Sequence, residues 1–192
     1  MEKAGVGSKV VAVIGDSTFL HSGITGVVDA VYNQAQVTII ILDNGTTAMT
    51  GHQDHPGTGI SARGKKTKAV ELERLVRGIG VDDVKVVDAF DMKALRAAVR
   101  SSIDNPELSV VIVRGACSVR LRKRSGPRAV GMDKCDDCET CLKLGCPAIQ
   151  KLDEQVYIDV IMCAGDACTV CEQLCPKKAI GPLTAIGAEE SR

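Results

Sequence analysis

Cysteine is the residue of this chain with the clearest chemical pattern. Eight of the nine cysteines lie in the last third of the sequence, in two groups that each end in Cys-Pro. The groups read Cys135-x2-Cys138-x2-Cys141-x4-Cys146 and Cys163-x4-Cys168-x2-Cys171-x3-Cys175. This doubled spacing is typical of a pair of [4Fe–4S] clusters, in which the last cysteine of each run binds the other cluster. The pattern therefore predicts a small electron-transfer domain.

The expected ligands of each cluster follow from that rule. The first cluster takes three cysteines from the first group and one from the second, and the second cluster takes the reverse set: Cys135, Cys138, Cys141 and Cys175, then Cys163, Cys168, Cys171 and Cys146. Both groups contain extra residues relative to the common x2, x2, x3 spacing, so a complete second cluster stays an open question. Four-cysteine zinc sites also use Cys-x2-Cys pairs, and zinc stays open as well.

A second chemical pattern follows two apolar runs near the start of the chain. Lys9–Ile14 is followed by Gly15-Asp16-Ser17-Thr18, and Val37–Leu42 by Asp43-Asn44-Gly45. The carboxyl ends of neighbouring parallel strands are where open α/β sheets bind ligands. Asp16 and Asn44 offer the hard oxygens that Mg²⁺ prefers, and the N–H groups near Ser17 and Thr18 suit a diphosphate. Gly-Asp and Asn-Gly are also common turns, so the spacing alone leaves this site undecided.

Alternating strands and helices must position those residues. After the first run, apolar residues recur at helical spacing from Leu20 to Val31, including Val28, and again from Leu72 to Ile79. Further apolar runs at Val84–Val87 and Ser109–Val113 predict strands, and Asp91 is the expected N-cap of the helix between them. The order predicts an α/β domain, a parallel sheet with helices on both faces. Residues 43–66 form a long loop, which suggests function.

Composition limits the remaining possibilities. The chain has 192 residues with 24 basic and 24 acidic side chains, so its net charge does not favour nucleic acid or a membrane. Aromatic residues make up 2%, too few for a surface that stacks bases. The sequence shows no signal peptide and no long apolar stretch, and we expect its thiols in a reducing cytoplasm. Cys117, outside both groups, is expected to be a packed, inert thiol.

These features divide the chain into three expected regions. Residues 1–118 form the α/β domain, residues 119–129 form a basic linker, and residues 130–192 form a small two-cluster ferredoxin-like α+β domain. The linker is expected to be a solvated connector, and the alternative is recognition of an anionic ligand such as a coenzyme phosphate. It carries four arginines and a lysine: Arg120, Arg122, Lys123, Arg124 and Arg128.

The first domain also resembles a known family. Gly15-Asp16-Ser17 followed by Asp43-Asn44 is similar to the thiamine diphosphate motif, a Gly-Asp-Gly sequence with a later Asn. Residues 46–53 resemble the Tyr-Gly-Met-Thr-Gly-Gly-Gln segment of 2-oxoacid:ferredoxin oxidoreductases. A thiamine domain followed by a two-cluster ferredoxin domain resembles the layout of the indolepyruvate:ferredoxin oxidoreductase alpha subunit family.

The resemblance implies specific residue roles. Asp16 and Asn44 would bind Mg²⁺ through their side chains, and Thr46 through its carbonyl. The residues near thiamine diphosphate would be Gly15, Ser17, Thr18, His21, Thr50 and His52. Ser17 stands where the family has glycine, and Thr47 where related enzymes often carry tyrosine. His21 and His52 are also explained as an ordinary polar helix start and turn, as is His55.

The resemblance further implies an activity and partners. The family oxidises and decarboxylates arylpyruvates with coenzyme A, and ferredoxin accepts the electrons. In the family an upstream pyrimidine-binding segment supplies the carboxylate that activates thiamine, so this chain would need that segment and a beta subunit. No catalytic residue is assigned here. The alternative is a non-catalytic electron carrier or scaffold, in which a ferredoxin domain is joined to a degenerate α/β module and only the clusters work.

Overall fold

The computed structural model describes residues 9–120 and 125–189. The chain divides into two compact units, Met1–Cys117 and Ser118–Arg192. Arg122, Lys123 and Arg124 of the predicted basic linker lie outside the described residues. Across the described ranges, no helix is both long enough and apolar enough to span a membrane.

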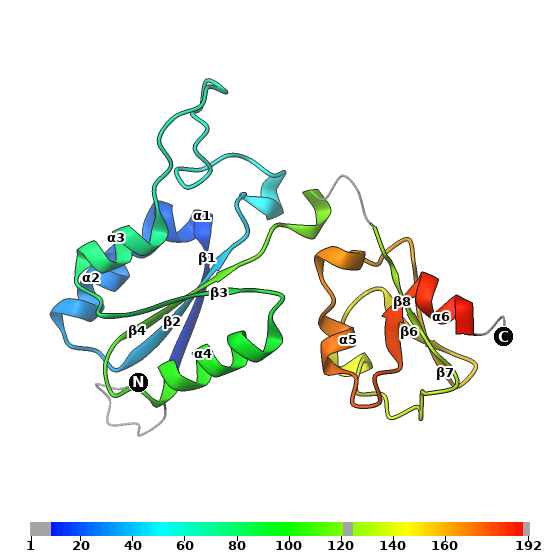
Figure 1. The fold of residues 1–192 in the computed structure, drawn as a ribbon. Helices are drawn as coiled ribbons and strands as arrows, with labels where there is room; N and C mark the ends of the chain where they lie inside the picture. The colour runs from blue at the N-terminus through cyan, green and yellow to red at the C-terminus, as the bar shows by residue number, and fades with distance from the viewer. Residues whose placement is uncertain (1–8, 121–124, 190–192) are drawn as a thin grey trace. The chain divides into compact units, whose positions relative to one another are not determined.

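The first unit contains a parallel sheet, as the sequence predicts (Figure 1). Its strand order is β1 (Val10–Gly15), β2 (Val37–Asp43), β4 (Ser109–Arg114) and β3 (Asp83–Asp88), and each neighbouring pair is parallel. These are the apolar, β-branched runs identified in the sequence, and β4 is buried on both faces as such a run predicts. The edge strand β1 differs, because Val11 and Val13 are 42% and 61% exposed. Because β1 and β2 are neighbours, the residues that follow them meet at one edge of the sheet.

A single helical segment follows β1. It consists of α1 (Asp16–Thr18), a π-helical turn (Phe19–Gly23) and α2 (Ile24–Tyr32). A Cβ atom at Gly23 would lie 2.8 Å from Ile14 Cδ1 and 2.9 Å from Phe19 Cδ2. Glycine at this position therefore lets the segment pack closely on β1. Short π-helical turns are often found at functional sites, and this one begins three residues after Asp16.

The other two helices of the unit have clear end signals. Helix α3 (Leu72–Ile79) ends at Gly80, whose φ of 109° lies in the left-handed region that glycine adopts readily. Helix α4 (Met92–Asp104) begins after Asp91, whose carboxylate accepts hydrogen bonds from the backbone N–H groups of Lys93 and Ala94. The predicted N-cap at Asp91 is confirmed.

Helices cover both faces of the sheet, which confirms the predicted fold class. One face packs against α2 and α3 through a cluster that includes Phe19, Ile41 and Val76, and the other packs against α4 through Ala98, Val111 and Val113 (Figure 1). Val28 was expected to face the core, but it is 49% exposed. Helix α2 instead buries Val27 and Ala30, so the inward face is narrower than the apolar pattern suggested.

The long loop between β2 and α3 is ordered by its own hydrogen bonds. A 3-10 turn (Ala48–Thr50) follows the end of β2, and Thr47 pairs with Gln53 in an isolated bridge. Further on, Val70 N donates to Pro56 O at 2.9 Å, which folds the loop back on itself. The loop is therefore built to hold residues 46–57 near the sheet edge.

The second unit contains two small antiparallel sheets. Strand β5 (Arg128–Val130) pairs with β8 (Ile180–Pro182), and β6 (Ile149–Leu152) pairs with β7 (Gln155–Ile158). Its described residues also include two short α-helices, α5 (Val170–Leu174) and α6 (Leu183–Glu189), and three 3-10 turns (Ser118–Arg120, Leu142–Leu144 and Gly165–Ala167). Its core combines small apolar residues such as Ala148 and Val156 with cysteines of both groups.

Arg128 does not lie in a solvated linker, contrary to the sequence-based expectation. It begins β5 and is 5% exposed. Its Nε donates to Glu172 at 2.7 Å, and its Nη1 donates to Asp166 at 2.8 Å. A guanidinium has enough N–H groups to bridge two carboxylates, and this bridge makes Arg128 part of the second unit.

Candidate functional site

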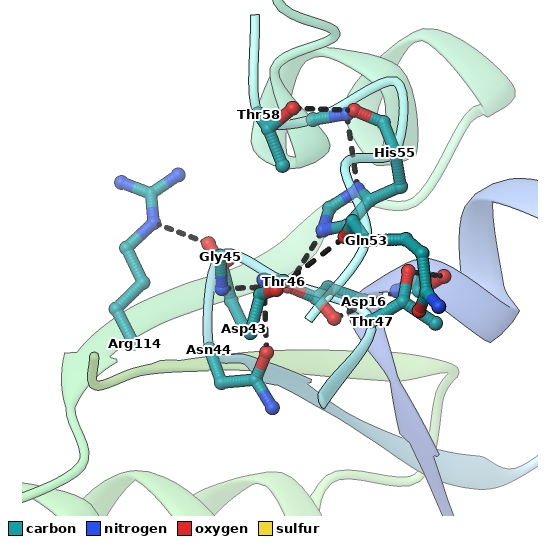
Figure 2. Close-up of polar contacts among 12 residues, drawn as sticks. Asp16, Asp43, Asn44, Gly45, Thr46, Thr47, Gln53, His55, Thr58 and Arg114 are labelled. Carbon is teal, nitrogen blue, oxygen red and sulfur yellow. Dashed lines mark hydrogen bonds and ion pairs between the residues drawn. The ribbon is translucent and has the colours of Figure 1, made fainter. Parts of the chain in front are cut away.

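Asp16 is the central residue of the sheet-edge site. It directly follows β1, and it is 2% exposed. Its Oδ1 accepts from Ser17 N at 2.7 Å. Its Oδ2 accepts from Gly45 N at 2.8 Å (Figure 2). The carboxylate thus joins the end of β1 to the loop after β2. Burial of a carboxylate costs free energy unless the group accepts hydrogen bonds or binds a cation. Asp16 accepts two hydrogen bonds, and its position also suits a bound cation.

Asn44 and Thr46 lie in the loop that contacts Asp16. Thr46 N donates to Asn44 Oδ1 at 3.0 Å, and Thr46 itself is 1% exposed (Figure 2). The Asn44 oxygen is therefore turned toward its own loop. An amide oxygen has two lone pairs, so this hydrogen bond leaves one for a cation. The structure brings the loop of Asn44 to Asp16, as the sequence predicts for adjacent strands.

Ser17 links the helical segment to the loop after β2. Its hydroxyl lies 2.7 Å from Thr47 Oγ1, and it is 8% exposed. Its backbone N–H, which was expected to face a diphosphate, donates to Asp16 instead. His21 Nδ1 lies 2.7 Å from the Ser17 carbonyl, so His21 bonds to its own helical segment. A carbonyl only accepts, and Nδ1 therefore carries the ring proton in this contact.

Gly15, Thr18 and Thr50 have more open surroundings. Gly15 has an extended backbone, and a Cβ atom there would meet no atom of the described chain within 4 Å. Neither strain nor packing explains this glycine, whereas a ligand that approaches the backbone would. Thr18 and Thr50 are exposed, and the Thr50 hydroxyl donates to Gln53 Oε1 at 2.6 Å.

His52 lies beside Cys117, a contact that sequence reasoning missed. The Cys117 sulfur is 3.6 Å from His52 Nε2. Cys117 is half-buried, and its role as a packed, inert thiol stays a prediction. His52 has a φ of 64°, a left-handed conformation that is uncommon for residues other than glycine. The two residues are 65 positions apart, and no local pattern could have paired them.

His55 was not among the predicted site residues, yet it contacts Asp16. Its Nε2 lies 3.3 Å from Asp16 Oδ2, and its side chain is 1% exposed (Figure 2). The contact has the length of an ion pair but lacks the direction of a hydrogen bond. Gly57 N donates to the other ring nitrogen, Nδ1, at 3.1 Å. The available sequence signal was the His-Pro-Gly turn, which fixes a histidine within a loop.

A cation bound to a diphosphate fits this set of residues. The site offers a buried carboxylate at Asp16, an amide oxygen at Asn44, and open space at Gly15. Hard oxygen donors of this kind match Mg²⁺, which takes few ligands from protein when phosphates supply others.

In the second unit, four cysteines surround one small cavity. Cys135, Cys138, Cys141 and Cys175 line it together with apolar residues such as Val130 and Val156. Burial raises the pKa of the Cys135 thiol, and negative charge on Asp137 and Cys175 adds to the effect. Burial also raises the pKa of Cys141, with further contributions from Cys135 and Cys175. These are the four cysteines that the spacing assigns to the first cluster.

The other four cysteines of the two groups also lie near one another. Burial raises the pKa of Cys171 to about 11, and charge on Cys163, Cys168 and Cys146 contributes. The Cys163 sulfur accepts backbone N–H groups from Arg128 at 3.4 Å and Gly165 at 3.3 Å. All nine cysteines are free thiols. Among the described residues, no group of three His, Cys, Asp or Glu side chains converges on a single-ion position.

Comparison with known proteins identifies the first unit. Residues 2–113 match the family "Thiamine pyrophosphate enzyme, C-terminal TPP binding domain". The fold is also similar to a solved 2-oxoglutarate:ferredoxin oxidoreductase from Magnetococcus marinus, with a TM-score of 0.50 and 15% identity over 55% of this chain and 40% of that chain. At this identity the similarity establishes the fold alone.

Curated relatives extend the match into the second unit. "Indolepyruvate oxidoreductase subunit IorA" of Archaeoglobus fulgidus is 42% identical over 182 residues, which are 91% of this chain and 29% of that protein. The subunit of the same name from Methanothermobacter marburgensis is 39% identical over 93% of this chain and 29% of its own length. The chain thus spans under a third of the length of these relatives. The relatives confirm the family resemblance found in the sequence. The chain belongs to the thiamine pyrophosphate enzymes, and its first unit carries their C-terminal thiamine pyrophosphate-binding domain.

Proposed function

We propose that this chain is the cofactor-binding and electron-transferring part of a thiamine diphosphate-dependent 2-oxoacid:ferredoxin oxidoreductase. The observation that carries the proposal is the buried carboxylate of Asp16 at the carboxyl edge of the sheet. One backbone N–H group from helix α1 and one from the loop after β2 hold this carboxylate in place. This is the position at which a parallel α/β sheet binds its ligand.

In this proposal the sheet edge holds the diphosphate of the cofactor through Mg²⁺. Asp16 and Asn44 contribute side-chain oxygens, and Thr46 contributes its carbonyl. The residues placed nearest the cofactor are those of the sequence prediction: Gly15, Ser17, Thr18, His21, Thr50 and His52. Bound thiamine diphosphate supplies the reactive carbon at which a 2-oxoacid is decarboxylated, and the protein holds and orients it.

The second unit carries two [4Fe–4S] clusters in a ferredoxin-like domain in this proposal. Support comes from the four cysteines around one cavity and from the contribution of Cys163, Cys168 and Cys146 to the raised pKa of Cys171. Each set combines three cysteines of one group with the last cysteine of the other, as two-cluster proteins require. Backbone N–H groups on the Cys163 sulfur would tune the cluster potential.

The substrate and partners follow from the relatives. Because they are named indolepyruvate oxidoreductase subunits, we assign an arylpyruvate of the indolepyruvate type, with coenzyme A as acyl acceptor and ferredoxin as electron acceptor. The chain spans 29% of these relatives, so we expect a beta subunit and a pyrimidine-binding segment to complete the site. The reaction would take place in a reducing cytoplasm, where iron–sulfur clusters persist.

Substitution of Asp16 tests the thiamine site. The assembled enzyme, purified without oxygen, is titrated with thiamine diphosphate and Mg²⁺ by calorimetry. Asp16→Asn should weaken binding by about 10-fold or more, because a neutral amide replaces the charged ligand. Asp54→Asn, an exposed position in the same loop, is the matched control and should bind normally. Unchanged binding by Asp16→Asn would show that the site assignment is wrong.

Metal analysis of the same preparation tests the second unit. The proposal expects about eight irons and eight sulfides per chain. The same iron content with no thiamine binding in the assembled enzyme would favour the alternative function, a non-catalytic electron carrier. Zinc without acid-labile sulfide, in protein kept free of oxygen, would instead indicate structural zinc sites.

A further inference from the structure

His55 is a buried histidine that has no role in the function proposed above. Its side chain is 1% exposed, and its Nε2 lies 3.3 Å from Oδ2 of Asp16, whose side chain is 2% exposed (Figure 2). Within the described part of the chain, this nitrogen is buried without a hydrogen-bond partner. A buried polar atom that lacks a partner costs free energy, so its placement against the Asp16 carboxylate needs an explanation.

The other ring nitrogen determines where the proton lies. Gly57 N donates to His55 Nδ1 at 3.1 Å, which makes Nδ1 an acceptor. A neutral imidazole carries one proton, and when Nδ1 accepts, the proton is on Nε2. His55 therefore presents an N–H group toward the Asp16 carboxylate.

The surrounding loop holds the ring in place. A Cβ atom at Gly57 would lie 3.0 Å from His55 Cε1 and 3.2 Å from Leu20 Cδ1, so glycine is what lets the turn close on the ring. The His55 carbonyl accepts from both the backbone N–H and the hydroxyl of Thr58, each at 2.9 Å. His55 is thus a fixed donor rather than a mobile loop residue.

We propose that His55 is a positioning residue that directs Asp16 toward the metal. Asp16 Oδ2 already accepts from Gly45 N, and Oδ1 accepts from Ser17 N. Each carboxylate oxygen has two lone pairs. His55 places its Nε2–H group 3.3 Å from Oδ2, which leaves Oδ1 as the oxygen with an open lone pair. His55 therefore selects Oδ1 as the oxygen that binds the cation, and it stabilises the carboxylate in that orientation. This inference rests on the proposed Mg²⁺–thiamine diphosphate site.

Two substitutions separate donation from packing. Gln places a donor near the position of Nε2, so His55→Gln keeps an N–H group against Asp16. Asn places an acceptor near the position of Nδ1, so His55→Asn keeps the bond from Gly57 and removes the N–H group that faces Asp16. Mn²⁺ is the probe, and its binding to the assembled enzyme with thiamine diphosphate is measured by electron paramagnetic resonance. His55→Asn should weaken Mn²⁺ binding by about 10-fold or more, while His55→Gln should stay near wild type.

A measurement on the wild-type protein adds a readout independent of folding defects. Nitrogen-15 NMR of labelled histidine reports which ring nitrogen carries the proton, and His55 should show the Nε2–H form without added metal. The Nδ1–H form would overturn the inference, as would equal Mn²⁺ affinity in the Asn and Gln variants. If one of these two results is obtained but the wild-type enzyme binds Mn²⁺, the proposed function still holds and only the role of His55 is wrong. If wild-type enzyme binds no Mn²⁺, the proposed function fails, and the inference fails with it.

Discussion

The interiors of the two units differ in composition. In the first unit, the fully buried side chains include Ile41, Val110 and Ile112, each 0% exposed. In the second unit, Val156 is the largest fully buried apolar side chain, and cysteines of both groups pack around it. Apolar burial stabilises a domain by itself, whereas an interior lined with thiols depends on what the thiols bind. The first unit should therefore fold without a cofactor, and the second should require one.

Strand length points the same way. The strands of the first unit have six or seven residues, and they form one sheet within the described chain. Those of the second unit have three or four residues and pair only two by two in the described ranges. An isolated two-stranded pair is marginal in water, so metal ligation is the expected source of the missing stability.

The largest predicted effect is the response to iron removal. In the proposed cluster-bound chain, extraction of iron and sulfide should unfold the second unit and leave the first unit folded, because only the second unit would depend on thiol ligation. Hydrogen exchange followed by mass spectrometry would show lost protection in residues 125–189 and retained protection in residues 9–117. Retained protection in both units after iron loss would show that the second unit does not need iron to stay folded.

A core substitution in the first unit should have the next largest effect. Ile112→Ala should lower the free energy of unfolding of this unit by about 2–5 kcal/mol, since it leaves a cavity in a fully buried position. Denaturant unfolding of the iron-loaded chain, followed by hydrogen exchange, measures the loss. Val156→Ala in the second unit is the matched control, and it should leave the midpoint of the first unit unchanged. A lower iron content in Ile112→Ala would show that the units are not independent.

The sequence predicted the sheet well because its signals are local. The apolar runs that became β1, β2, β3 and β4 contain the same residues in the structure to within one position at either end. The cap at Asp91 is also local, since the N–H groups that donate to its carboxylate belong to residues within three positions. Spacing alone likewise grouped the cysteines into the two sets that lie near one another in the structure.

Long-range contacts account for what the sequence did not predict. His55 meets Asp16 across 39 positions, because the loop after β2 folds back over the sheet edge. Arg128 contacts Asp166 and Glu172 across 38 and 44 positions of the sequence. Neither contact follows a periodic or regularly spaced sequence pattern. The basic residues around Arg128 therefore predict an ordinary solvated linker when the sequence is considered alone.

The ion pairs of Arg128 provide a smaller test in the second unit. Arg128→Lys should lower the stability of the iron-loaded unit by about 1.5 kcal/mol, because a lysine cannot bridge both carboxylates and they are partly open to water. The pKa of Asp166 is lowered, chiefly by its hydrogen bond from Arg128. Its contribution is therefore present above its ordinary pKa of 3.8 and is lost as the pH falls below it. Thermal unfolding against pH measures this, and the dependence should weaken in Arg128→Lys.

The smallest predicted effect concerns a polar network in the first unit. Burial alone would raise the pKa of Asp83, but hydrogen bonds from Lys85, Ser109 and Asn105 hold it below its ordinary value of 3.8. A lowered carboxylate pKa stabilises the folded state above pH 3.8, and this stability is lost as the pH falls through the lowered pKa. Asp83→Asn should cost about 1 kcal/mol near neutral pH and remove that part of the acid sensitivity.

The hydrogen-bond network of Asp83 lies at the amino end of β3 and β4, away from the sheet-edge site. Ser109 Oγ donates to Asp83 at 2.6 Å, and Lys85 Nζ also donates to Ser102 at 3.0 Å. Asp82→Asn, the exposed neighbour, is the matched control and should leave the urea midpoint unchanged. If Asp83→Asn alone weakens thiamine diphosphate binding, the amino end of the sheet is coupled to the ligand site. Unchanged binding would show instead that the first unit separates the residues that stabilise its fold from those that hold its ligand.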